Sequence, residues 1–180
     1  METFVKAKPF VWDLDFRTSR AKALRNMDLS DIDEPIAGLI ESFTLVAHCF
    51  TLQSCWGHSV HDGQPDPHGC ETLAGYSDDT QIRFRLAYIA LCLENSRPGH
   101  DLREELCSLV SIDPACIQFG SAEWFWKQHV NSYVLQVEPE RYKDLDYCTI
   151  GIEEALYLEK LKARIFQEIR KIIEGHSQGR

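Results

Sequence analysis

The spacing of apolar residues near the end of the chain constrains the fold most. They recur three or four residues apart, as Leu158, Leu161, Ile165, Ile169 and Ile172. This pattern predicts a long amphipathic helix over residues 152–174. A helix with one apolar face has to cover another element, so the rest of the chain must supply a sheet or further helices.

Both kinds of partner are expected. The same spacing and capping signals predict helices over residues 15–27, 31–46 and 101–111, and alternation predicts strands over residues 49–54, 82–94, 116–119 and 130–137. Between these elements no glycine-rich turn offers a dinucleotide fingerprint. A chain of 180 residues has the usual length of one domain. We therefore expect a single α+β domain over residues 1–180, with a mixed or antiparallel sheet flanked by helices.

The sequence predicts a cytoplasmic protein with no membrane span. The longest apolar run covers eight residues, 86–93, whereas a membrane span needs about 20. No apolar stretch follows the first lysines, so no signal peptide is expected. Seven cysteines in such a chain predict thiols that are free or bound to a metal, rather than a disulfide framework.

The charge distribution disfavours nucleic acid as a partner. The chain has 19 Lys and Arg against 28 Asp and Glu, a net charge of −9. Residues 26–82 contain no Lys or Arg and ten acids. A ligand of this region is expected to be cationic or neutral, and a tRNA partner is disfavoured.

Histidine and cysteine gather in one segment. Residues 48–70 hold seven of the 14 His and Cys of the chain. Imidazole and thiolate are the preferred ligands of zinc, and short spacings bring two donors to one ion. The segment therefore predicts a zinc or iron site, with these ligands: Cys55, His58, His68 and Cys70, and His61 as a substitute.

The same segment allows an interpretation without metal. Residues 54–58 follow a predicted strand, and Gly57 permits a ligand to approach the backbone closely. Cys55 could then act as a nucleophile paired with His58. Further along, Trp124 has aromatic and polar neighbours and could stack on a purine.

Residues 50–58, Phe-Thr-Leu-Gln-Ser-Cys-Trp-Gly-His, resemble the Ser-Ser-Cys-Ser-Gly-Arg signature of the wybutosine-synthesis tRNA methyltransferase family. His58 stands where that family has Arg, and Trp56 stands where it has Ser. The order of the flanking elements is also similar, from a helix and an Ile-Asp helix start to a long final helix.

The resemblance implies an α+β fold, S-adenosylmethionine as methyl donor and a tRNA base as substrate; because the chain is acidic, we expect a nucleobase or small molecule. It implies a pocket between the first helix, the turn at 54–58 and Trp124. Lys22 and Asp33 would position the substrate, and Ser54, Cys55 and His58 would form the turn around it, with Gly57 in the same turn contacting the cofactor. The cofactor is a sulfonium cation, which suits the acidic region.

A third hypothesis has no catalysis. The long final helix and the aromatic segment 124–126 could form the interface of a homo-oligomer. The three hypotheses are thus a methyltransferase-like enzyme, a metal-binding module and an interaction protein.

Overall fold

The computed structural model describes residues 4–61, 73, 80–142, 145 and 147–178. The elements follow in this order: β1 (Phe4–Lys6), α1 (Phe16–Asn26), η1 (Leu29–Asp31), α2 (Glu34–Phe43), β2 (Cys49–Cys55), β3 (His58–Val60), β4 (Gln81–Arg85), β5 (Ala87–Leu93), α3 (Arg97–Ser108), η2 (Leu109–Ile112), β6 (Ile117–Ala122), α4 (Glu123–Gln128), β7 (Ser132–Val137), η3 (Glu140–Tyr142), β8 (Tyr147–Gly151) and α5 (Ile152–Ser177). The η elements are short 3-10 helices.

The strands form two antiparallel sheets. The larger has five strands in the order β1-β6-β7-β5-β2, and the smaller has three in the order β3-β4-β8. Every pairing of neighbouring strands is antiparallel. The predicted α+β class, with antiparallel sheets, flanking helices and a long C-terminal helix, is confirmed.

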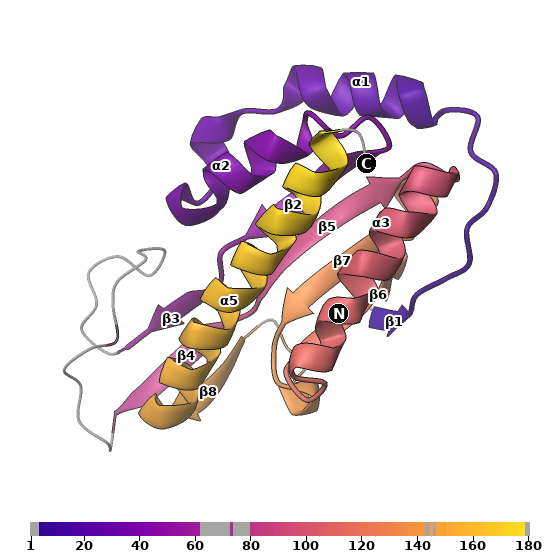
Figure 1. The fold of residues 1–180 in the computed structure, drawn as a ribbon. Coiled ribbons are helices and arrows are strands. Elements are labelled where there is room, and N and C mark those ends of the chain that lie inside the picture. The colour runs from indigo at the N-terminus through magenta and orange to yellow at the C-terminus, as the bar shows by residue number, and fades with distance from the viewer. Residues whose placement is uncertain (1–3, 62–72, 74–79, 143–144, 146, 179–180) are drawn as a thin grey trace.

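Three helices cover one face of the larger sheet. Figure 1 shows α2, α5 and α3 side by side in front of the strands. Successive side chains of a strand point to opposite faces, and in β5 the residues Ile89 and Leu91 point into this helix-covered core. They meet Leu39 of α2, Leu106 of α3 and Ile165 of α5 in one cluster of buried residues.

The opposite face of the larger sheet is covered by smaller elements. Cys92 of β5 lies there with Phe50 of β2, against Phe16 at the start of α1. Ala90 of the same strand packs with Phe125 of α4. Because β5 is buried on both faces, it is apolar at almost every position.

The last helix joins the two sheets. It runs for 26 residues, which corresponds to about 39 Å at the usual rise. Its first turns, with Ala155 and Leu158, pack on Ile82 and Phe84 of the smaller sheet. Its later turns belong to the core under the larger sheet, and Figure 1 shows it crossing both.

Three sequence predictions differ from the structure. The single strand expected over residues 82–94 is two strands, β4 and β5, which belong to different sheets and are separated by Leu86. Between the strands expected over residues 49–54 and 82–94, no further strand was predicted, yet residues 58–60 form β3, which pairs with β4. The short elements β1, α4 and β8 were not predicted, because three to six residues carry little periodicity.

The second helix also begins later than predicted. Residues 29–31 form η1, with Asp28 as its N-cap residue, and residue 31 does not start the helix expected over residues 31–46. The helix α2 starts at Glu34, with Asp33 as its N-cap residue and Pro35 in its first turn. The carboxylate of Asp33 does not cap the helix, so it is available for other contacts.

Within the described ranges, no helix is both long and apolar enough to cross a bilayer. The cysteines placed by the structure are all free thiols, as expected: Cys49, Cys55, Cys92, Cys107, Cys116 and Cys148.

Candidate functional site

A cleft of about 610 Å³ lies between α1, the η1 turn and β2. This volume is within the range of about 300–1,000 Å³ that small-molecule sites usually have. Polar residues from three parts of the chain contribute to its lining. They include Lys22, Asp28, Asp31, Gln53, Ser54 and His129.

The cleft has both charged and apolar walls. Ser30 donates hydrogen bonds to Asp28 Oδ1 from its backbone N–H, at 2.9 Å, and from its hydroxyl, at 2.7 Å. These bonds lower the pKa of Asp28, so its carboxylate stays ionised at neutral pH. Ile32 and Leu52 add apolar surface to the same lining. The cleft can therefore hold a ligand that has both an apolar ring and charged groups.

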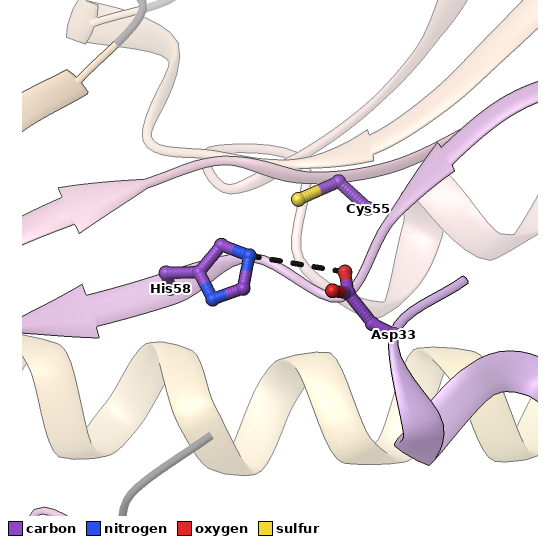
Figure 2. A group of neighbouring side chains, drawn as sticks. All are labelled: Asp33, Cys55 and His58. Carbon is purple, nitrogen blue, oxygen red and sulfur yellow. Dashed lines mark ion pairs between the residues drawn. The ribbon is translucent and has the colours of Figure 1, made fainter. Parts of the chain in front are cut away.

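A second group of functional side chains lies beside the cleft. One ligand atom each of Asp33, Cys55 and His58 lies within 4.8 Å of the other two. His58 Nε2 lies 3.8 Å from Asp33 Oδ2. Figure 2 shows these three side chains pointing toward one another. Their chain neighbours Ile32 and Ser54 line the cleft, so the two sites adjoin.

The turn at Trp56–Gly57 holds this group together. The chain leaves the larger sheet at Cys55, the last residue of β2, and enters the smaller sheet at His58, the first residue of β3. Gly57 makes the turn with φ +80°, a conformation that glycine adopts without strain. A Cβ at this position would lie 2.8 Å from the Cβ of Ala87, so only glycine fits.

Backbone hydrogen bonds orient two of the three side chains. The N–H of Trp56 donates to Asp33 Oδ2 at 2.7 Å, and the N–H of Gly57 donates to Cys55 Sγ at 3.3 Å. The Asp33 carboxylate, which does not cap α2, therefore accepts a hydrogen bond from the turn. This bond holds the start of α2 at the junction of the two sheets.

Cys55 is buried, which bears on its chemistry. Burial raises the pKa of the Cys55 thiol, and the Asp33 carboxylate adds to the increase. Catalytic cysteines have a lowered pKa, because the thiolate is the nucleophile. The surroundings of Cys55 therefore favour a thiol or a metal-bound thiolate over a free nucleophile paired with His58.

Sequence reasoning missed one residue of this region, Lys162 of α5. Its side chain is 1% exposed, and its Nζ donates to the carbonyl of Gly57 at 3.2 Å and to Glu159 Oε1 at 2.8 Å. It also lies 4.5 Å from the ring centroid of Trp56. Lysine is rarely buried unless its charge is paired, so composition alone gives no reason to place Lys162 in the core. Position 162 is four residues after buried Leu158, and this spacing could have revealed it.

The remaining predicted residues are distributed as follows. Lys22 and Ser54, predicted to bind the ligand, both line the cleft. Trp124 lies on α4, is 57% exposed and is not among the cleft residues. His68 and Cys70 lie outside the described residues.

Comparison with known proteins bears on the fold. No protein-family model and no curated protein matches the chain. Among solved structures, the PH1069 protein from Pyrococcus horikoshii matches with a TM-score of 0.51 and 12% identity, over 89% of this chain and 93% of that one. A hypothetical protein from Aeropyrum pernix matches with a TM-score of 0.42 and 8% identity, over 81% and 98% of the two chains. The chain therefore shares its fold with the PH1069 protein.

Proposed function

We propose that the cleft binds S-adenosylmethionine and that the protein transfers the methyl group of this cofactor to a nucleobase or another small molecule. The observation that carries the proposal is the set of charged residues in one cleft, Asp28, Asp31 and Lys22. The cofactor has a sulfonium, an amino group and a carboxylate, and these three residues have the complementary charges. The resemblance of residues 50–58 to the wybutosine-synthesis methyltransferase signature supports the same ligand.

Each wall of the cleft has a role in this proposal. The carboxylates of Asp28 and Asp31 attract the sulfonium and the amino group, and Lys22 pairs with the carboxylate. The apolar side chains of Ile32 and Leu52 cover the adenine ring. Gln53 supplies an amide that can donate to and accept from the polar edge of a base.

When bound, the cofactor supplies an electrophilic methyl carbon, and its C–S bond breaks with both electrons passing to sulfur. The chain then has to accept the proton that leaves the nucleophilic N or O of the substrate. His129 lines the cleft and carries an imidazole suited to this role. We assign His129 as the general base.

The charge of the chain favours a small substrate over a tRNA. A long polyanion needs a basic surface, whereas this chain has a net charge of −9 and no Lys or Arg between residues 26 and 82. A free nucleoside or a similar small molecule does not need such a basic surface. Filter binding of tRNA at physiological salt tests the preference for a small substrate separately from cofactor binding.

Calorimetric titration with S-adenosylmethionine tests the proposal. The wild-type protein should bind one equivalent, and Asp31→Asn should weaken binding by about 10-fold, or 1.4 kcal/mol. Asp15→Asn removes the same charge from an exposed residue outside the cleft and should leave affinity unchanged. Absence of binding at millimolar cofactor, or equal effects of the two substitutions, would refute the proposed site.

A further inference from the structure

We propose that Asp33, Cys55 and His58 bind one divalent transition-metal ion, and that zinc fits them best. This site adjoins the cleft but shares none of its lining residues, and it does not depend on the methyl donor. The three residues come from three elements: the residue before α2, the end of β2 and the start of β3. They supply one oxygen, one sulfur and one nitrogen ligand.

The distances suit a metal after a small contraction. Tetrahedral zinc with bonds of about 2.0–2.3 Å keeps its ligand atoms about 3.3–3.6 Å apart. Asp33 Oδ2 and His58 Nε2 are 3.8 Å apart, and all three ligand atoms lie within 4.8 Å of one another. Displacement of these ligand atoms by a few tenths of an ångström to about 1 Å would bring them to the separation of a tetrahedral site.

The ligands are held in place by the protein backbone. The N–H groups of Trp56 and Gly57 bond to the carboxylate and the sulfur, and such bonds to ligand atoms are the usual second layer of a metal site. The turn itself is held on two sides, because Gly57 lies against Ala87 and its carbonyl accepts from Lys162. The site is therefore largely formed before an ion arrives.

The donor set indicates which ion and which kind of site. Imidazole, thiolate and carboxylate together are typical zinc ligands, whereas magnesium and calcium prefer oxygen alone. Three protein ligands are also the number found in zinc sites that keep a fourth position for water or substrate. Asp33 is partly exposed, whereas Cys55 and His58 are buried. Water or substrate would therefore reach the fourth coordination position from the side of Asp33.

Cobalt(II) serves as the probe, because a thiolate ligand produces a charge-transfer absorption that other ligands do not. Untagged protein treated with a chelator should bind one Co²⁺ per chain with this absorption, and Zn²⁺ should displace it. Cys55→Ser should abolish the charge-transfer band. His58→Gln and Asp33→Asn should weaken Co²⁺ binding by at least about 10-fold.

Two control variants make the test specific. Cys107→Ser removes an exposed thiol far along the chain and should leave the spectrum unchanged. The double variant His68→Gln/Cys70→Ser removes the other two donors that the sequence suggested, and it should also leave the spectrum unchanged. Folding of each variant is checked by circular dichroism, and if His58→Gln fails to fold, Asp33→Asn answers the same question.

The proposal is overturned if the wild-type protein binds no Co²⁺ at micromolar concentration, or binds it without the thiolate band. It is also overturned if Cys55→Ser keeps the band while the double variant loses it. Each of these results leaves binding of S-adenosylmethionine to the cleft untouched, so the two proposals fail independently.

Discussion

Replacing Gly57 with alanine should destabilise the protein strongly, because two separate costs arise at one position. The residue has φ +80°, and the left-handed conformation costs a residue with a Cβ about 1–2 kcal/mol. The new Cβ would lie 2.8 Å from the Cβ and 2.9 Å from the backbone nitrogen of Ala87. Relief of this overlap has to move backbone, at a further cost of about 1–3 kcal/mol.

The two costs add to about 2–5 kcal/mol of lost unfolding free energy. Urea denaturation measures it, and with a typical slope of about 2 kcal/mol per molar the midpoint should fall by about 1–2.5 M. Gly38→Ala is the matched control. Its Cβ would meet nothing closer than Arg170 Nη1 at 3.8 Å, and because Gly38 lies inside α2 the change should stabilise by about 0.5–1 kcal/mol.

The result that would refute this reasoning is a Gly57→Ala midpoint equal to or above that of the wild-type protein. Destabilisation of similar size in Gly38→Ala would refute it too, because the effect would then not come from the turn. If Gly57→Ala destabilises the protein and Gly38→Ala stabilises it, the requirement for glycine lies in the turn between the two sheets.

Three further outcomes are expected. Lys162→Met should lower the unfolding free energy by about 3 kcal/mol. This is the lower end of the range for breaking a buried ion pair, because the partner Glu159 is 27% exposed. A loss below about 1 kcal/mol in the same urea series would contradict a stabilising role of the buried Lys162 ion pair. Burial and the neighbouring His176 lower the pKa of His48 below 6.5, so the unfolded chain binds the additional proton and stability should fall as the pH drops below that value. His48→Gln should flatten this dependence, measured as urea midpoints from about pH 7 to about pH 5, and an unchanged slope would count against it. A disulfide reagent should label the exposed thiol of Cys107 within the folded protein but reach Cys49, whose pKa burial raises to about 12, only after denaturation; equal rates would show that the strand opens freely.

Periodicity predicted the long elements well, because each buries one face. The helix α5 and the strand β7 were expected nearly where they lie. The break between β4 and β5 was missed although the sequence contains a signal for it. Apolar residues alternate with Arg83 and Arg85 in β4, whereas β5 is apolar at almost every position. This change from alternating to continuous apolar residues at Leu86 marks the switch from one sheet to the other.

The candidate site was predicted in part. Cys55 and His58 are three residues apart, so their proximity follows from the sequence once a turn lies between them. Asp33 was expected near the ligand but not beside these two, since nothing local shows that its carboxylate leaves the helix cap. Lys162 reaches the turn across 105 positions of the chain, and contacts of that separation depend on the tertiary fold.

The uninterrupted course of α5 has a consequence for how the molecule unfolds. The apolar face of the three-stranded sheet has to be covered by another element, and here Ala155 and Leu158 of the same helix that continues under the larger sheet cover it. Melting the first turns of α5 would therefore remove support from β4 and β8 together. The amide protons of both strands should exchange with solvent in the same cooperative opening as those of the helix, which makes the two sheets a single unit in native-state hydrogen exchange.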